Sequence, residues 1–201
     1  MIRVPKLLCE HLGQVEGLDV SEDRDHWDYL YSVQELIDLS GNRFHKKKNL
    51  YRQFEKKYDW AYRCMSSTCV EVALEMQEAW MSWRDSESQQ LLKSENTAVH
   101  RTLKHFDEIS GIMGGTLYVE GKIVAYTIAE ALDPDNIVIH FEKGDTRFKG
   151  VYQAINKLFL ENDAGYYKWV NREQDMGEEG LRKAKLSYNP VGFVEKCEVV
   201  G

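Results

Sequence analysis

The stretch from Asn171 to Pro190, NREQDMGEEGLRKAKLSYNP, combines carboxylates, cations and a phenol within twenty residues. The run YYKWV before it is apolar, aromatic and bounded by glycine, which is typical of a buried strand that carries Asn171 and Glu173 at its C-terminal tip. A carboxylate at such a tip is suited to take a proton from an attacking amine or hydroxyl. Glu173 and Asp175 are therefore the candidate general bases.

A helix is expected directly after this tip, ending before Pro190. Asp175 fits an N-cap, because Glu178 follows three residues later and the two can form a capping box. Asp175 therefore has two interpretations, a base and a cap, and the sequence favours neither.

The end of that helix brings two cations beside one phenol, because Arg182 and Lys185 are three residues apart and Tyr188 follows. Cations near a helix C-terminus complement its dipole, which is one interpretation. In the other, Arg182 and Lys185 hold a donor phosphate or the carboxylate end of an acceptor. Tyr188 is likewise either a packed aromatic residue or the acid that protonates a leaving group.

A second basic block, LSGNRFHKKKNLYRQFEKKY, extends from Leu39 to Tyr58. The spacing predicts a helix over residues 44–58 whose buried face is aromatic and whose outer stripe is cationic, with Lys48, Arg52 and Lys56 at four-residue intervals. Such a stripe is either a solvated face or a polyanion site, since charge-assisted hydrogen bonds hold phosphates without reading bases. The candidate donor-binding residues of this block are His45, Lys46, Lys48, Asn49 and Arg52.

The rest of residues 25–110 also has helical periodicity, and we expect a helical region. The expected helices are Trp27–Leu39 with Asp25 as a cap, Val70–Arg84, and one ending near Phe106 after the polar connection DSESQQ. Residues 1–24 have little periodicity and are expected to form an irregular lead-in.

At Gly111 the apolar period changes from about 3.6 to 2, which predicts strands. Glu120-Gly121 suits a hairpin turn, and IVIHFEK is a third strand on which His140 and Glu142 share one face and line the candidate site. A helix over 150–160, the strand into Asn171, the motif helix and a last strand over 193–200 complete the order. Residues 111–201 are thus a mixed α/β (α+β) unit preceded by a helical segment.

Composition allows one well-cored domain or two small ones, since the chain has 201 residues, 43% hydrophobic and 29% charged. No apolar run approaches the roughly 18 to 20 residues that cross a bilayer, and a cytoplasmic location is expected. The four cysteines lack metal-ligand spacing, so buried free thiols are expected and no metal site. The net charge of −7 argues against a broad nucleic-acid footprint but permits a local basic patch.

These two basic blocks, together with GGTLYVEGKIVAYTIAEAL and YQAIN between them, resemble the phosphatidylglycerol lysyltransferase C-terminal-domain family. The resemblance covers most of the chain after residue 25 and implies a GNAT-like acyltransferase core with a mixed sheet. Members of that family commonly have a first acyltransferase-like half. The resemblance therefore implies that residues 1–24 are a remnant of such a half, and that a partner protein could supply it.

GNAT enzymes hold the donor pyrophosphate with a pattern similar to R/Q-x-x-G-x-G/A at a helix N-terminus. Arg147 and Gly150 match this pattern, whereas Tyr152 replaces the final small residue. The departure disfavours acetyl-CoA, and the lysyltransferase resemblance implies an aminoacyl-tRNA donor. Either donor, aminoacyl-tRNA or acyl-CoA, would be a co-substrate, and no resident cofactor is expected.

Two functions follow from these features. The first is a transferase that moves an activated acyl or aminoacyl group from a phosphate-bearing donor to an amine or hydroxyl, which requires positioning, a base and donors to the developing oxyanion. The second is a non-catalytic module that binds a phosphate-bearing ligand or a protein partner.

Overall fold

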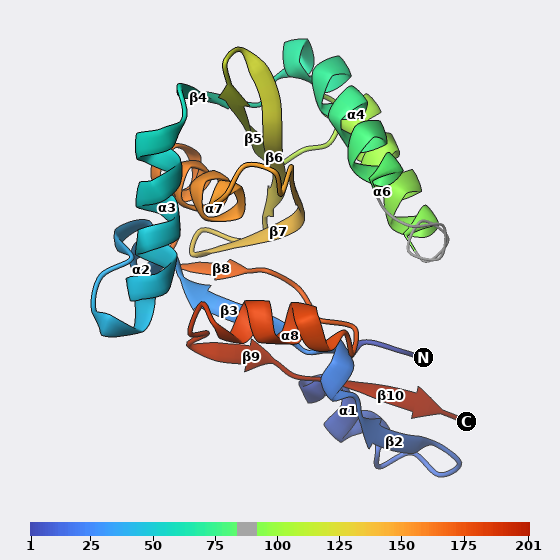
Figure 1. Ribbon diagram of the computed structural model, residues 1–201. Helices are drawn as coiled ribbons and strands as arrows, with labels where there is room; N and C mark the ends of the chain where they lie inside the picture. The colour runs from blue at the N-terminus through green and yellow to red at the C-terminus, as the bar shows by residue number, and fades with distance from the viewer. Residues whose placement is uncertain (84–91) are drawn as a thin grey trace.

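The computed structural model of the protein describes residues 1–83 and 92–201 (Figure 1). Its helices are α1 (Lys6–Leu12), α2 (Val33–Asp38), α3 (His45–Lys57), α4 (Ser67–Ser82), α6 (Lys93–Lys104), α7 (Val151–Asp163) and α8 (Glu179–Leu186), with short 3-10 turns at Arg24–His26 and Asn42–Phe44. Its strands are β1 (Val4–Pro5), β2 (Asp19–Glu22), β3 (Asp28–Ser32), β4 (Trp60–Cys64), β5 (Ile112–Val119), β6 (Lys122–Ala131), β7 (Asn136–Gly144), β8 (Trp169–Asn171), β9 (Gly192–Val194) and β10 (Lys196–Val200).

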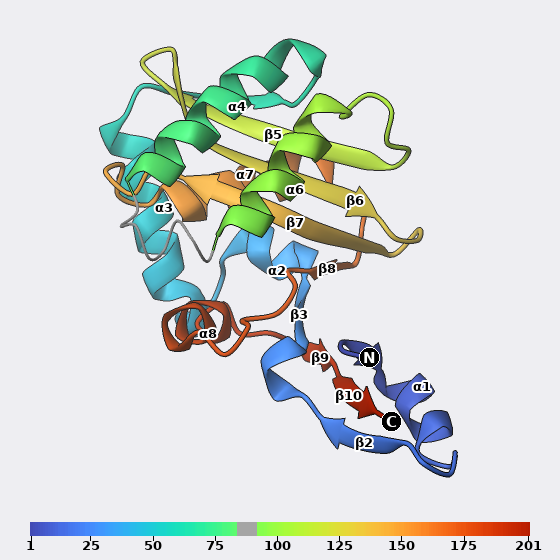
Figure 2. The same cartoon turned by 90° about the vertical axis from the view of Figure 1, so that its right-hand side faces the viewer.

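The described residues form a main sheet in the order β4-β5-β6-β7-β8-β3-β9, in which only β7 and β8 are parallel. Helices α4 and α6 cover one face of β5–β7, as Figure 2 shows, and α7 packs on the other face with α2 and α3 beside it. The expected mixed α/β fold is therefore confirmed. None of the helices in the described residues is both long and apolar enough to cross a membrane.

The β5–β6 hairpin forms where the change of period predicts it. Glu120 and Gly121 have φ angles of 50° and 76°, and two successive residues with positive φ are what a tight two-residue hairpin turn requires. The third strand follows a turn in which the Asp133 carboxylate accepts the backbone N–H of Asp135 and of Asn136. The expected order of hairpin, third strand, helix and strand is confirmed, and the structure adds that this strand, β8, is parallel to β7.

Strands β7 and β8 pair over a short distance only. Asn136 to Val138 lie beside Trp169 to Asn171, and β7 then continues to Gly144 without β8. A bulge interrupts β7 on its other side, because Ile139 and Phe141 both have partners on β6 while His140 between them has none. A bulge re-aims a side chain. The second half of β7 therefore presents polar side chains beside the tip of β8.

The expected helix from Trp27 to Leu39 is wrong over its first half. Residues Asp28–Ser32 form β3 between β8 and β9, with Tyr29 and Tyr31 buried, and only α2 is helical. The apolar residues of this segment fit a helical period, but pairing with strands more than 130 residues away decides the structure. Ser32, rather than Asp25, caps the helix by accepting the N–H of Glu35.

The expectation of an irregular lead-in is also wrong. Strands β1 and β2 flank β10 in a second sheet, against which α1 packs, so the two ends of the chain lie side by side (Figures 1 and 2). The single last strand expected over 193–200 is in fact β9 in the main sheet and β10 in this one. Cys9 and Cys197 form a disulfide here, which corrects the expectation of free thiols, whereas Cys64 and Cys69 are free.

The three other expected N-terminal helices are confirmed as α3, α4 and α6, with Phe54, Ala73 and Leu103 in their buried faces. The region expected to be helical also contains β4, which extends the main sheet beside β5. The polar connection DSESQQ lies outside the described residues.

Candidate functional site

The candidate site lies where β7 continues without β8. Arg172, directly after β8, donates from Nη2 to Glu142 Oε1 at 2.8 Å, and the two side chains are 12% and 9% exposed. The other Glu142 oxygen accepts from Asn156 on α7 at 3.0 Å. The carboxylate is therefore fixed from both sides, as a nearly buried charge requires.

His140, on the bulge of β7, is held between two carboxylates. Its Nδ1 is 2.9 Å from Glu173 Oε1, and its Nε2 is 2.9 Å from Glu130 Oε2. The hydrogen bond to Glu173 raises the pKa of His140 above its ordinary value of 6.5; burial opposes this shift, and Glu130 reinforces it. An imidazolium that donates to both carboxylates is the state that this arrangement favours.

The backbone of Glu173 is in the left-handed region, with φ of 54°, which is uncommon for a residue with a side chain. Its N–H donates to Asn171 Oδ1 at 2.7 Å, and its carbonyl accepts the N–H of Tyr29 at 3.2 Å. Asn171 in turn donates to Asp28, which is also paired with Lys196 of β10. Several elements therefore hold Glu173 in a conformation that sterics disfavour, a feature that clusters at functional sites.

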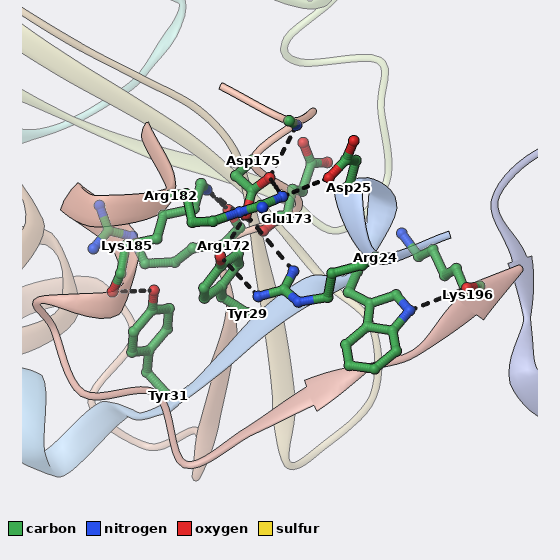
Figure 3. A network of polar contacts seen from close by, with 12 residues as sticks. Arg24, Asp25, Tyr29, Tyr31, Arg172, Glu173, Asp175, Arg182, Lys185 and Lys196 are labelled. Carbon is green, nitrogen blue, oxygen red and sulfur yellow. Dashed lines mark hydrogen bonds and ion pairs between the residues drawn. The ribbon is translucent and has the colours of Figure 1, made fainter. Parts of the chain in front are cut away.

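Asp175 is fully buried and does not cap α8, so the expected capping box is wrong. The helix begins four residues later with no side-chain cap, and Asp175 Oδ1 instead accepts the N–H of Gly177 at 3.0 Å. Figure 3 shows Arg182 reaching both Asp175 oxygens and also Asp25, while Tyr29 donates to Asp175. Burial opposes ionisation, but the bonds from Arg182 and Tyr29 outweigh it and lower the pKa of Asp175 to about 2.

Two cations, Lys47 and Arg172, lie against the ring of Tyr188, which is buried, and a third, Lys185, lies next to Arg172. Lys47 Nζ lies 3.9 Å from the centre of the Tyr188 ring, and the Arg172 guanidinium carbon lies 4.8 Å from it. Lys185 donates to the backbone carbonyl of Arg172, and its own carbonyl accepts from Tyr31 (Figure 3). Burial and the charge of Arg172 lower the pKa of Lys47 and of Lys185 to about 8.

The other candidate residues lie outside this cluster. His45 and Asn49 contact each other on α3, and Lys46 and Arg52 are exposed there with Lys48 half-buried beside them. Arg147 is 72% exposed and is bound to Asp145 within its own loop. The structure thus brings together Asn171, Glu173, His140, Glu142, Lys185 and Tyr188, with Arg182 next to them on Asp175, and leaves the α3 stripe and Arg147 apart.

Arg172, Lys47 and Glu130 were absent from the candidates, although Arg172 directly follows Asn171 at the tip of the expected strand. Lys47 precedes Tyr51 by four positions and Phe54 by seven, so helical spacing places it on the buried face of α3 and could have identified it. Glu130 had no such signal, because only the pairing of β6 with β7 brings it to His140.

Gly150, at the N-terminus of α7, faces the backbone of α3. Its φ is 90°, and a Cβ there would overlap the carbonyl oxygen of Leu50. The N-terminus of α7, to which the resemblance to GNAT enzymes assigns the donor pyrophosphate, is therefore closely covered by α3. Within the described residues, no group of three or more His, Cys, Asp or Glu could hold a metal ion.

A family model described as the C-terminal domain of phosphatidylglycerol lysyltransferase matches residues 6–196. The chain belongs to this family. Its fold is also that of a conserved protein of unknown function from Bacteroides thetaiotaomicron, which is 34% identical with a TM-score of 0.91 over 99% of this chain and 68% of that one.

A more distant solved structure shares the fold, and one curated protein is similar in sequence. The structure of L-PGS from Bacillus licheniformis is 14% identical, with a TM-score of 0.68 over 98% of this chain and 65% of that chain. An uncharacterised protein from Mycoplasmoides gallisepticum is 25% identical over 174 residues, 84% of this chain. The chain spans 54% of the length of that curated relative. The mixed α/β arrangement that the sequence predicts is thus the fold of this lysyltransferase family.

Proposed function

We propose that the chain is an acyl- or aminoacyl-transferase domain that moves an activated group from a phosphate-bearing donor to an amine or hydroxyl. Membership of the lysyltransferase family supports the reaction class. The observation that carries the proposal is His140 between Glu173 and Glu130, with Glu173 fixed in a strained backbone at the tip of β8. His140 can act as a general acid and Glu173 as a general base, and the hydrogen bond between them keeps the two side chains next to each other.

In this reaction the acceptor N–H or O–H loses its proton to the Glu173 carboxylate as the nucleophile attacks the acyl carbon. The His140 imidazolium donates a proton to the leaving oxygen or sulfur of the donor as the acyl bond breaks. Transfer of the proton from Glu173 to His140 along their hydrogen bond restores both groups. Glu130 is the positioning residue that keeps His140 charged between turnovers.

The two other candidate catalytic groups are less suited to these roles. Both Asp175 oxygens accept hydrogen bonds, so we assign Asp175 to positioning Arg182 and Tyr29. Burial raises the pKa of Tyr188, which makes it a weaker acid than His140. An aminoacyl-tRNA is the preferred donor, because the cover of α3 over Gly150 disfavours a coenzyme A pyrophosphate there.

Turnover with labelled donors tests this function. The protein is incubated with [14C]aminoacyl-tRNA or [14C]acetyl-CoA and a panel of amine and hydroxyl acceptors, and label transferred to the acceptor is measured. We expect transfer from aminoacyl-tRNA, and a loss of roughly 100-fold or more in Glu173→Gln. Glu178→Gln is the matched control, since this exposed carboxylate at the start of α8 makes no side-chain cap.

The alternative is a non-catalytic module that binds a phosphate-bearing ligand or a protein partner. It is favoured by one observation: both His140 nitrogens and both Glu142 oxygens are already bound to protein groups. Binding of the donor without turnover, equal in the parent and in Glu173→Gln, would select it. A partner protein that completes the site and a cytoplasmic location stay predictions.

A further inference from the structure

The usual anion site of this fold is covered here, since α3 packs directly on Gly150 at the start of α7. The first turn of α7 also carries Tyr152, which packs near Gly144 at the end of β7. A phosphate-bearing substrate therefore needs another anion site within reach of His140 and Glu173.

Arg172 and the lysines next to it, Lys47 and Lys185, provide an excess of positive charge beside the tip of β8. Lys47 comes from α3, Arg172 from the end of β8 and Lys185 from α8, so three separate elements contribute. Within residues 1–83 and 92–201, Glu142 is the only carboxylate that forms an ion pair with any of the three. Like charges repel in a partly buried site.

Arg172 and Lys47 also have unfilled hydrogen-bonding capacity, whereas Lys185 already donates to the carbonyls of Arg172 and Glu173. Nη1 of Arg172 is buried and has no partner among the described residues. The ammonium group of Lys47 contacts the Tyr188 ring and, in the part of the chain that the structure describes, no acceptor oxygen. Buried donors in native proteins nearly always have partners, and an unpaired one indicates a missing water or ion.

We propose that Lys47, Arg172 and Lys185 form a subsite for one phosphodiester group of the substrate, at the junction of α3, α8 and the tip of β8. This subsite rests on the transferase function proposed above. Arg172 donates through its fork and Lys47 as a point charge from α3, so a tetrahedral phosphodiester can accept from different directions. Arg182 takes no part, because Asp25 and Asp175 already hold it.

Neighbouring lysines give a matched test. Lys47→Met keeps an apolar chain on the Tyr188 ring, and Lys48→Met removes the same charge from the next position on α3, outside the cluster. Lys185→Met and Lys183→Met form a second pair on α8, where Lys183 is exposed. Circular dichroism and melting temperature establish that each variant is folded, and the Lys47 pair keeps the test valid if Lys185→Met unfolds.

Dimethyl phosphate, a minimal phosphodiester, is titrated into each protein and binding is followed by NMR chemical shifts. We expect Lys47→Met to weaken binding by about 10-fold and Lys48→Met to change it less than twofold. Equal binding by the two variants would overturn the subsite. Acetate binding as tightly as dimethyl phosphate would overturn the phosphodiester assignment.

Two larger probes distinguish the sources of the phosphodiester. An RNA minihelix represents a donor, and dihexanoyl phosphatidylglycerol represents a phospholipid acceptor; the probe whose affinity falls in Lys47→Met and not in Lys48→Met identifies the source. These assays need no turnover. Loss of binding in Lys47→Met without transfer in any labelled assay would retain the subsite and reject the transferase, whereas transfer unaffected by Lys47→Met would reject the subsite alone.

Discussion

Arg172 and Glu142 are joined at 2.8 Å where β7 and β8 cease to pair, so one ion pair links the polypeptide after β8 to the unpaired half of β7. Both side chains are nearly buried, and Asn156 fixes the second oxygen of Glu142. Removal of one member of such a pair leaves the other charge buried without a counter-charge. The pair therefore holds the candidate site in shape.

Glu142→Gln is expected to lower the free energy of unfolding by about 3 to 5 kcal/mol, because Arg172 loses its only ion-pair partner among the described residues. Urea denaturation measures this change. Glu35→Gln is the control, since its pair with Arg43 is largely exposed and should contribute about 0 to 1 kcal/mol. Similar losses in the two variants would contradict the role of burial.

Asp175 is expected to make the fold sensitive to acid. Its folded pKa of about 2 is below the ordinary value of 3.8, so its contribution to stability is complete above 3.8 and is lost as pH falls through about 2. Asp175→Asn should be less stable than the parent at neutral pH and lose less stability between pH 4 and pH 2. Unfolding midpoints across this range provide the measurement, with the exposed Asp19→Asn as the control. Parallel pH profiles for parent and Asp175→Asn would refute the assignment.

His140 should titrate above 6.5, since Glu173 and Glu130 both stabilise its charged form. Its contribution to stability is complete below 6.5 and is lost as pH rises through the raised pKa. An NMR titration of the imidazole should give a lower pKa in Glu173→Gln, a smaller decrease in Glu130→Gln, and no change in Glu178→Gln. An unshifted pKa in Glu173→Gln would exclude the pairing on which the proposed acid and base depend.

Gly150→Ala is expected to destabilise the junction of α3 and α7 strongly, for two reasons. The added Cβ would overlap the carbonyl oxygen of Leu50, and the backbone of residue 150 has a φ of 90°, which alanine rarely adopts. Gly41 also has a positive φ, of 78°, but a Cβ added there would meet no other atom of the described residues. Gly41→Ala should therefore lower the free energy of unfolding by only about 1 kcal/mol. Thermal unfolding compares the two. If both variants lose the same stability, α3 does not cover the end of α7 closely.

The sequence predicts the parts of this fold that depend on local chemistry. The Glu120-Gly121 turn and the helical spacing of Tyr51 and Phe54 specify β5–β6 and α3 without information from elsewhere in the chain. The segment Asp28–Ser32 was misassigned because its strand exists only through pairing with β8 and β9. The residue pattern of one segment cannot predict its pairing with strands that are distant in the chain.

The same distinction applies to the site. Strand tips and alternation are local features and led to Glu173, His140 and Glu142 as candidates, whereas Tyr29, one of the residues that bind Asp175, lies 146 residues earlier in the chain. Through that contact Asp175 is a buried hydrogen-bond acceptor and not a helix cap. The disulfide of Cys9 with Cys197 spans 188 residues and is equally invisible to spacing rules. For Lys47 a signal was present, because its helical spacing to Tyr51 and Phe54 is local, but the candidates of α3, Lys48 among them, did not include it.

Binding of dimethyl phosphate should weaken as pH rises through about 8. Lys47 and Lys185 have folded pKa values of about 8, so both lose their charge there, whereas free lysine keeps its proton to about 10.5. Without the anion, the folded protein binds fewer protons than the unfolded chain between about 8 and 10.5, and its stability should rise with pH over that window. Bound dimethyl phosphate favours the charged form of the two lysines. Its stabilisation of the folded protein against unfolding should therefore be largest below pH 8 and disappear above pH 8. Denaturation at pH 7 and pH 9, with and without dimethyl phosphate, measures this. The stabilising effect should be smaller in Lys47→Met and unchanged in Lys48→Met, and an effect independent of pH in the parent would show that the anion binds elsewhere.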